Sequence, residues 1–494
     1  MSGEVLIGVD IGASAIKAGA FALDGKPLAL TSRPNGPVAQ PGGDGWFMWD
    51  AVALRGALLD ALCEVAGRLP RSATPRSLAV AGFGADGAPF APSGEQRYPI
   101  ISWHDARARA PLRQLVEQVG EHELYALTGY HPYPINTLAR WLWLRDHVPA
   151  ALDGARWLMV ADIAAYWLSG VMRTDPTCAS TTMAFDLRRD AWARDLLELA
   201  RIPPQLPAPL GEPGEAIGAF ERPLAGLPAG TVVAIGGHDC EVGTLAASAG
   251  LPPGTQIDIT GTWEMVIAPT HEFAPTEELF ERGIDWERHA VRGTFLCQSL
   301  MPAGSVLAWV RDLAYGAGDG AWTKMIADAE RTEPGARGVE VVPAFVPGMG
   351  PSARREGAGA LLGLTITTTR GQIARAAFEA LCLQLRAQLE VLEHVTGTRC
   401  SALRVLGGGQ RNDFWLQLKA DVTGLPVEAV ETEELTLLGA ALLGGVGAGI
   451  YASVEEAQRT VQHRARVFEP RPDSQRRYEE LFFERTAREP ARSA

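Results

Sequence analysis

The sequence predicts a two-domain α/β protein with a ligand cleft between the domains. At 494 residues the chain is too long for one ordinary hydrophobic core. Strand-like and helix-like segments alternate along most of it, which is typical of α/β folds. Near residue 255 the chain restarts with a strand and a Gly-Thr turn that repeat its opening. We therefore expect one domain over residues 1–246 and a second over residues 247–494.

Apolar periodicity predicts the elements of the first domain. Residues 5–23 form two strands joined by a turn at residues 12–14, and residues 27–33 add a third strand. Proline and glycine predict surface loops over residues 84–94 and 203–230. The other elements predicted here are a helix over residues 50–69, strands over residues 78–82, 156–160 and 231–235, and a small-residue helix ending near residue 250.

The second domain shows the same kind of pattern. Residues 255–268 begin it with an alternating strand that carries an acidic residue and leads through a Gly-Thr turn. The other elements predicted here are helices over residues 372–395, 412–423, 435–443 and 474–488 and a strand over residues 403–406. Together they make a second α/β unit.

Composition and charge exclude several classes of partner. Apolar residues make up 47% of the chain and charged residues 21%, as in packed globular proteins. The net charge of -13 opposes contact with a polyphosphate backbone, so we expect no nucleic-acid partner. The opening residues show no export signal and no apolar run is long enough to cross a bilayer, so we expect no membrane partner. The six cysteines occur singly, which favours reduced thiols in a cytoplasmic protein.

The first motif that carries chemistry is the turn Gly12-Ala13-Ser14, with Asp10 before it and Lys17 after it. Small residues let backbone N–H groups approach phosphate oxygens, and Ser14 adds a hydroxyl donor. Lys17 would add a positive charge, and Asp10 could hold a hydrated Mg²⁺. The alternative is a β-hairpin with an ordinary polar turn.

Two further glycine segments suit a nucleotide. Gly408 and Gly409 follow a predicted strand and would let a flat purine lie against the backbone. Asn412, at the start of the next helix, would cap that helix or reach the base or ribose. Gly261 and Thr262 mirror the first turn from the other domain, so two facing turns would hold one triphosphate. For the glycine run, a flexible strand-to-helix turn is the alternative.

Asp239 is the candidate catalytic base. It stands at the end of a predicted strand, and in phosphoryl transfer a carboxylate accepts the proton of the attacking hydroxyl. An aspartate that only caps the next helix is the alternative. Trp103, Asp105 and Arg107 combine an aromatic face with donors and acceptors, a mixture suited to a sugar. A buried tryptophan beside a helix start is the alternative there.

Other motifs are discounted. Residues 82–87 have the G-x-G-x-x-G spacing of a dinucleotide site, but Pro89 and Pro92 follow where a helix should begin, so we predict a loop. The only Gly-Lys pair is followed by Pro27, which excludes a P-loop. Zinc-protease and serine-hydrolase motifs are also missing from the sequence.

The motifs together resemble the FGGY family of carbohydrate kinases, members of the actin-like (ribonuclease H-like) superfamily, over residues 5–451. Residues 359–379 match the family's C-terminal signature throughout. The N-terminal signature, residues 135–147, is matched at Trp143 but departs at Ile135 and at Arg140, where lysine is usual. We expect these departures to lie in a packing segment away from the chemistry. Positions in the C-terminal signature that carry the match include Gly363, Leu364, Gln372 and Ala376.

The resemblance implies two actin-like domains with a cleft for ATP, Mg²⁺ and a small ketose or polyol, with Asp239 deprotonating a sugar hydroxyl. It implies that Asp10 helps to hold Mg²⁺. The residues implied to bind the nucleotide are Gly12, Ala13, Ser14, Lys17, Gly261, Thr262, Gly408, Gly409 and Asn412. The residues implied to bind the sugar are Asp86, Trp103, Asp105, Arg107, His238 and Asp239.

Within the family, residues 12–14 are similar to fuculokinases and rhamnulokinases. Residues 83–87, 98–103 and 261–264 are most similar to fuculokinases, whereas residues 104–107 are similar to xylulokinases. We therefore expect transfer to the primary hydroxyl of a ketose, with L-fuculose first and D-xylulose, L-xylulose or D-ribulose as alternatives. Two other classes stay open: an actin-like ATP-binding protein without kinase activity, against which Asp239 argues, and a dehydrogenase using residues 82–87. A homodimer is expected by analogy alone.

Overall fold

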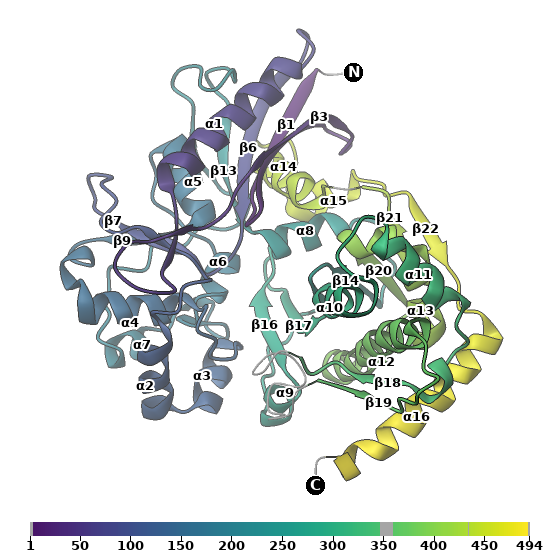
Figure 1. Ribbon diagram of the computed structural model, residues 1–494. Coiled ribbons are helices and arrows are strands. Elements are labelled where there is room, and N and C mark those ends of the chain that lie inside the picture. The colour runs from purple at the N-terminus through teal and green to yellow at the C-terminus, as the bar shows by residue number, and fades with distance from the viewer. Residues whose placement is uncertain (1–2, 346–358, 433, 493–494) are drawn as a thin grey trace.

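The computed structural model describes residues 3–345, 359–432 and 434–492, which form two α/β domains on two separate mixed sheets (Figure 1). The first sheet has the order β12-β13-β6-β1-β2-β3. It opens with the predicted antiparallel run, and β6 and β13 then add in parallel beside β1. Its strands are β1 (Glu4–Ile11), β2 (Ala15–Ala22), β3 (Pro27–Pro34), β6 (Thr74–Gly82), β12 (Ala216–Ala219) and β13 (Val232–His238).

The second sheet repeats this pairing pattern, with the order β16-β17-β15-β14-β20-β21-β22. An antiparallel run starts at β14, and β20 and β21 add in parallel on its other side. The expectation that the second half repeats the first is therefore confirmed. Its strands are β14 (Thr255–Thr260), β15 (Trp263–Thr270), β16 (Ile284–Arg288), β17 (Phe295–Pro302), β20 (Ala402–Leu406), β21 (Val427–Val430) and β22 (Ala465–Phe468).

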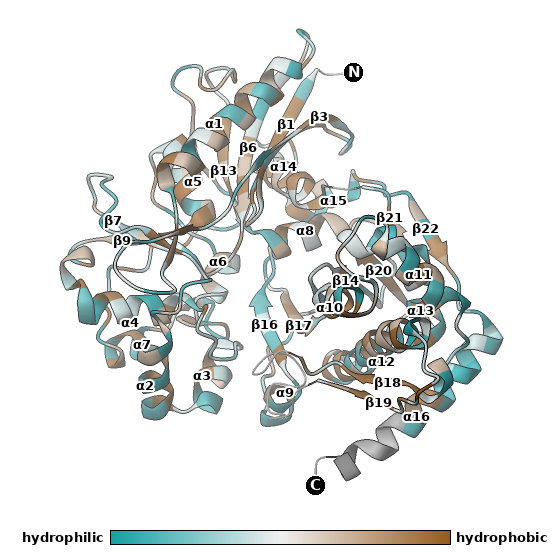
Figure 2. Ribbon diagram, in the orientation of Figure 1, coloured by the Kyte–Doolittle hydropathy of each residue, from teal (hydrophilic) through white to brown (hydrophobic). Residues whose placement is uncertain are grey.

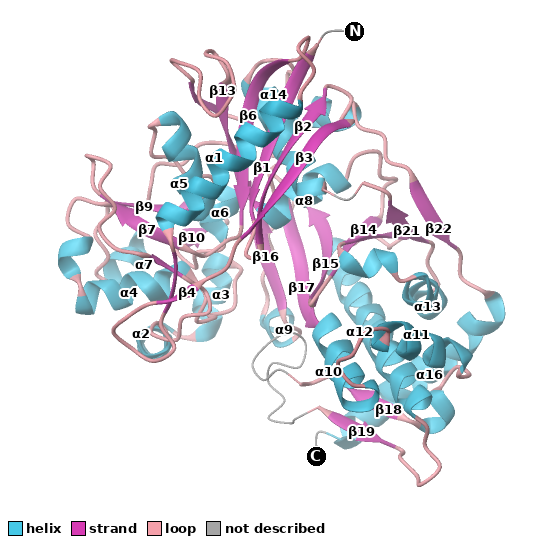
Figure 3. Cartoon of the chain, turned by 45° about the horizontal axis from the view of Figure 1, so that its top comes forward, coloured by secondary structure: helices cyan, strands magenta, loops and turns pink. Residues whose placement is uncertain are grey.

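Two helices, α8 (Asp239–Ala247) and α14 (Leu435–Gly447), lie between the sheets, as Figures 1 and 3 show. A Cβ on Gly8 of β1 would lie 1.9 Å from the carbonyl oxygen of Leu437, and one on Gly439 would lie 2.0 Å from that of Val242. Glycine at both positions is therefore what lets α14 pack against β1 and α8. Figure 2 draws α14 mostly in brown, as expected of a helix buried on all sides.

The outer faces of the sheets are covered by other helices. α1 (Ala51–Arg68) and α5 (Val160–Ser169) cover the first sheet, and α12 (Arg370–Thr396) and α13 (Asp413–Thr423) cover the second. Val266 of β15 faces the core that includes α12, whereas its neighbour Ile267 faces α14. This alternation is the two-residue period of a strand buried on both faces. The predicted helices are thus present within a few residues of their expected bounds.

A lobe of the first domain is built on a small sheet in the order β4-β5-β8-β7-β9. Residues 84–94, predicted as a loop, contain β7, and the loop predicted over residues 203–230 contains β12. Both predictions were wrong there, because pairing with β9 and β13 outweighs the local turn residues. The lobe comprises β4 (Val38–Ala39), β5 (Phe47–Trp49), β7 (Gly87–Phe90), β8 (Ile100–Ile101), β9 (Arg156–Met159), β10 (Phe185–Asp186), β11 (Ala191–Trp192), α2 (Arg109–Val119), α3 (Glu121–Thr128), α4 (Thr137–His147), α6 (Pro176–Ser180) and α7 (Arg194–Leu199).

The remaining elements surround the second sheet. They are α9 (Glu277–Glu281), α10 (Gly304–Tyr315), α11 (Ala321–Arg331), β18 (Glu340–Val342), β19 (Ala360–Leu362), α15 (Val454–Arg459) and α16 (Pro472–Arg492). Among the described residues, no helix has both the length and the apolar composition that a membrane span needs.

Candidate active site

Three parallel strands of the first sheet end side by side. Asp10 of β1 pairs with Ala81 of β6, and His238 of β13 pairs with Gly82 of β6. Asp239, the next residue, begins α8. The carboxyl ends of parallel strands are where α/β proteins bind ligands. The fold therefore brings two predicted residues, Asp10 and Asp239, to one edge of the sheet.

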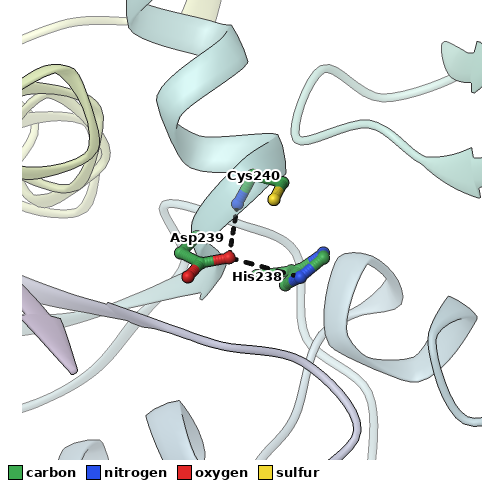
Figure 4. Close-up of side chains that lie close together, drawn as sticks. All are labelled: His238, Asp239 and Cys240. Carbon is green, nitrogen blue, oxygen red and sulfur yellow. Dashed lines mark hydrogen bonds and ion pairs between the residues drawn. The ribbon is translucent and has the colours of Figure 1, made fainter. Parts of the chain in front are cut away.

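The two carboxylate oxygens of Asp239 differ in their surroundings (Figure 4). Oδ1 accepts a hydrogen bond of 2.7 Å from the backbone N–H of Cys240 and lies 3.3 Å from Nε2 of His238. Oδ2 has no hydrogen-bond donor in the described part of the chain, and the side chain is 26% exposed. Asp239 thus presents one oxygen that is held and one that is free to accept a proton.

Asp10 lies in a buried and electronegative position. Its Oδ1 is buried without a donor among the residues described. Burial first, and then the charges of Asp239 and Glu434, raise the pKa of Asp10 to about 8, although Lys17 opposes the shift. Lys17 itself forms an ion pair of 2.8 Å with Glu434, at the start of α14. A divalent cation would supply the positive charge that this site lacks, so the residues fit Mg²⁺.

The turn between β1 and β2 is held tightly through its backbone. The N–H of Gly12 donates to the carbonyl oxygen of Ala15 at 3.0 Å. The backbone and side chain of Asn35 donate to the carbonyl oxygens of Ser14 and Gly12. A Cβ on Gly12 would lie 2.8 Å from the carbonyl oxygen of Ala15, so the turn needs glycine. Ala13 and the exposed Ser14 complete it.

The second turn, Gly261-Thr262, is fixed against the start of α10. Gly304 N–H donates to the carbonyl oxygen of Gly261 at 3.0 Å, and Ser305 N–H donates to that of Thr262 at 3.1 Å. A Cβ on Gly304 would lie 2.3 Å from the oxygen of Gly261, so this approach also needs glycine. The turn is therefore fixed both by its own bond from Gly261 N–H to the carbonyl oxygen of Trp263 at 2.7 Å and by the start of α10.

The glycine run at residues 407–409 packs on Thr260, the last residue of β14. A Cβ on Gly407 would lie 2.7 Å from the carbonyl oxygen of Thr260, and one on Gly409 would lie 2.5 Å from its methyl group. Gly408 is exposed and has no neighbouring atom where a Cβ would stand. Asn412 caps α13 by accepting from Trp415 N–H at 3.2 Å. The run and the Gly261 turn thus flank the same strand end.

The predicted sugar residues of the lobe are mostly buried. Asp86 accepts hydrogen bonds from Trp49 Nε1 at 2.7 Å, Trp103 N–H at 2.8 Å and Arg140 at 2.8 Å. Burial raises the pKa of Asp86 to about 6, despite the neighbouring Arg140. Arg140 is buried in α4, as expected of a packing segment, and its guanidinium forms a buried ion pair with Asp86.

Asp105 and Arg107 form a second buried ion pair, and each side chain is only 1% exposed. The Arg107 guanidinium also stacks on the rings of Trp46 and Trp143. Trp103 is different, because it is 38% exposed. Its ring stacks on His104 with centroids 3.7 Å apart. Of the four predicted sugar residues in the lobe, Trp103 alone presents a surface to a ligand.

Several residues near the site were not singled out from the sequence. Glu287 of β16 lies 2.8 Å from His238 Nδ1. Lys419 of α13 forms buried ion pairs with Asp258 and Glu264 behind the Gly261 turn. Glu241 of α8 lies beside His238 and Glu287, and its one sequence signal is a second acidic residue, after Asp239, in a helix of mostly small and apolar residues. Glu287 carries no such signal, since a strand with three charged residues of five resembles a solvated edge.

Comparison with known proteins shows the family to which the chain belongs. The models of the N-terminal and C-terminal domains of the FGGY family of carbohydrate kinases match residues 5–246 and 259–448. The L-fuculokinase of Escherichia coli (strain K12) is 31% identical over 96% of this chain and 98% of its own. The glycerol kinase of Rhodospirillum rubrum is also 31% identical, over 96% of each chain. The crystal structure of xylulose kinase from Rhodospirillum rubrum has a TM-score of 0.87 at 24% identity, over 98% of each chain.

The fold and these matches define a carbohydrate kinase, a phosphotransferase that uses ATP and acts on small-molecule sugars. The protein belongs to the FGGY family of carbohydrate kinases. The alternative of an ATP-binding protein without kinase activity is therefore not supported. Residues 82–87 lead into strand β7 rather than a helix, so the dinucleotide motif also lacks its structural context.

Proposed function

We propose that the protein transfers the γ-phosphoryl group of ATP to the primary hydroxyl of a ketose, with L-fuculose as the first candidate. The observation that carries the proposal is the free Oδ2 of Asp239 at the strand ends where Asp10 also stands. The 31% identity to an L-fuculokinase over nearly the whole chain supports the choice of sugar. D-Xylulose, L-xylulose and D-ribulose are the alternatives, because residues 104–107 are similar to xylulokinases, and glycerol is tested beside them because a glycerol kinase is equally identical.

Two turns would hold the ATP phosphates from opposite domains. Gly12, Ala13 and Ser14 offer backbone N–H groups and a hydroxyl on one side, and Lys17 adds a positive charge. Gly261 and Thr262 offer the second turn, and the exposed Gly408 with Gly409 offers a flat backbone surface for adenine. The side chain of Asn412 caps α13, so Asn412 would support adenine binding by fixing where that helix begins.

Asp10 would hold Mg²⁺, directly or through water. When bound, the ion would neutralise charge that develops on the phosphate oxygens. Oδ1 of Asp10 is buried and has no donor among the described residues, which supports this role. Lys17, already paired with Glu434, would balance the charge of the same region.

On the sugar side, Trp103 would stack on the ketose and His238 would contact its hydroxyls. Asp86, Asp105 and Arg107 would shape the lobe that carries Trp103, since their polar atoms already have protein partners. The sugar oxygen would form a bond to the γ-phosphorus while the bond from that phosphorus to the β–γ bridging oxygen breaks. The hydroxyl proton would pass to Oδ2 of Asp239, and ADP would leave.

The test is coupled ADP release with MgATP across L-fuculose, L-rhamnulose, D-xylulose, L-xylulose, D-ribulose, L-ribulose, glycerol and erythritol. We expect one ketose to stand clear in kcat/KM, with L-fuculose first. Asp239→Asn keeps the Oδ1 acceptor but puts an NH2 group, which cannot accept a proton, in place of the free oxygen. We expect this change to lower turnover at least about a hundredfold and to leave ATP binding intact. Near-normal turnover of Asp239→Asn would rule out the role of Asp239 as base.

A cytoplasmic homodimer stays a prediction, and sedimentation equilibrium would test its dimeric state.

A further inference from the structure

The edge strand β16 is polar but buried. All five of its residues are buried, including Asp285, Glu287 and Arg288, and Figure 2 draws much of the strand in teal. Its backbone N–H at Trp286 donates to the carbonyl oxygen of Gly129, in the lobe of the first domain, at 2.8 Å. A strand of the second sheet is thereby joined to the first domain, and its charged side chains need partners there.

Glu287 finds its partner at the candidate active site. Its Oε2 lies 2.8 Å from His238 Nδ1, and its Oε1 accepts from Gln298 Nε2 at 2.8 Å. The other ring nitrogen of His238, Nε2, lies 3.3 Å from Oδ1 of Asp239. An imidazole with a carboxylate at each nitrogen satisfies both only when both nitrogens carry protons. The geometry therefore favours an imidazolium between Glu287 and Asp239.

Glu241 supplies a second, independent observation. Both of its oxygens are buried, with no donor among the residues that the structure describes. The carboxylates of Glu241 and Glu287 and the ring of His238 bring their ligand atoms within 4.8 Å of one another. Burial, followed by the charge of Glu287, raises the pKa of Glu241 well above its usual range. A protonated Glu241 would donate to Glu287 and leave that residue as the one ionised glutamate.

The charges around His238 agree with this arrangement. Burial alone lowers the pKa of His238, but Glu287 and the Cys240 thiol outweigh it, so the pKa lies well above the ordinary value. The groups that face His238 are Glu287 from β16 and Asp239, Cys240 and Glu241 from α8, and Thr177 of α6 accepts from the His238 backbone N–H. The surroundings supply anions and no competing cation among the described residues.

We propose that Glu287 is a positioning residue that keeps His238 doubly protonated, so that a cationic ring stands 3.3 Å from Oδ1 of Asp239 and Oδ2 is left as the base. The contact between Glu287 and His238 joins the second sheet to the first. The packing of β16 against the first domain therefore affects Asp239, the proposed base. The inference rests on the proposed role of Asp239. It adds a residue from the other domain, 49 positions from His238 in the sequence, to the machinery of proton transfer.

The test follows the His238 ring by NMR of full-length protein labelled at histidine Cε1. The His238 resonance is assigned as the one missing from His238→Gln. In the wild type it should keep its imidazolium shift through at least about pH 8, well above the ordinary midpoint of about 6.5. In Glu287→Gln the midpoint should fall towards about 6.5, because burial is then opposed only by Asp239 and Cys240.

Activity gives the second readout. At about pH 8, Glu287→Gln should lower kcat by about ten- to a hundredfold, the range for losing a charged hydrogen bond, and the loss should shrink as pH falls through the new midpoint. Asp285→Asn is the matched control, because it breaks the contact of the same strand with His131 and does not touch His238. Glu241→Gln keeps an N–H for Glu287 and should keep the high His238 midpoint.

A wild-type His238 midpoint at or below about 6.5 would overturn the proposal without any variant, even if Glu287→Gln fails to fold. An unchanged midpoint in Glu287→Gln, or an equal shift of the kcat–pH profile in Asp285→Asn, would also overturn it. The NMR titration needs neither ATP nor sugar. If the wild type phosphorylates no ketose, the proposed function fails while the link from Glu287 to His238 is still tested.

Discussion

Replacing Lys419 with methionine tests how the nucleotide side of the site is supported. Lys419 Nζ forms ion pairs with Asp258 and Glu264 and donates to Thr260 Oγ1 at 2.6 Å. All three charged side chains are at most 1% exposed. Thr260 precedes the Gly261 turn and packs on the glycine run at residues 407–409. Lys419→Met therefore leaves two buried carboxylates without a cation directly behind the proposed ATP site.

The size of the effect follows from burial. Removing one partner of a buried ion pair typically costs about 3–5 kcal/mol, because the remaining charge is left uncompensated. We expect Lys419→Met to lower the free energy of unfolding by that amount and to raise KM for MgATP more than KM for the sugar. In the wild type, burial raises the pKa of Glu264 to about 7, although Lys419 opposes the shift. A carboxyl group with a raised folded pKa stabilises below its unfolded pKa, and this contribution is lost as pH rises through about 7. In Lys419→Met the loss should extend to higher pH.

Urea unfolding followed by circular dichroism measures the change. Lys324→Met, at an exposed position on α11, is the matched control. A triple variant, Lys419→Met with Asp258→Asn and Glu264→Gln, removes every charge and should lose less stability than the single change. A loss below about 1 kcal/mol in Lys419→Met, or a triple variant no more stable than the single one, would refute the reasoning.

Two further predictions concern the metal and the sugar. Asp10→Asn should raise the Mg²⁺ concentration for half-maximal ADP release by roughly tenfold or more, and an unchanged requirement would contradict a metal role. In the wild type that requirement should fall as pH rises through about 8, the pKa of Asp10, because only the ionised carboxylate binds the cation. Trp103→Ala should raise KM for the preferred ketose by about three- to tenfold and leave KM for MgATP unchanged. Trp322→Ala, at an equally exposed tryptophan (38%), is the control, and an equal effect of both would argue against stacking.

Local sequence patterns predicted the parts of the candidate site that lie at strand ends. The turn after β1 needs glycine at residue 12, and the turn after β14 and the start of α8 also follow directly from predicted strands. Asp239 was predicted because a carboxylate directly after a buried strand lies at the edge of a parallel sheet, and Asp10 was predicted as part of the turn motif that follows β1. The antiparallel opening and its repeat near residue 255 were readable from alternation alone.

The buried charges of the lobe were harder to assign. A run with Trp103, Asp105 and Arg107 looks suited to a sugar, and local pattern does not say which side chains face outwards. Asp105 and Arg107 satisfy each other inside the lobe, whereas Trp103 remains exposed. The partner of Asp86 is Arg140, 54 residues away, and periodicity gives no register between a loop and a distant helix.

The amino-acid sequence was enough to predict the fold class, the family and the strand ends of β1, β13 and β14, because these depend on short-range patterns. The partners of the residues at those strand ends became known only from the folded chain. Lys17 pairs with Glu434, 417 residues away, and Lys419 reaches Asp258 across 161 residues. The physical reason is that a buried charge must be paired wherever the fold brings an opposite charge, and chain order does not record that meeting.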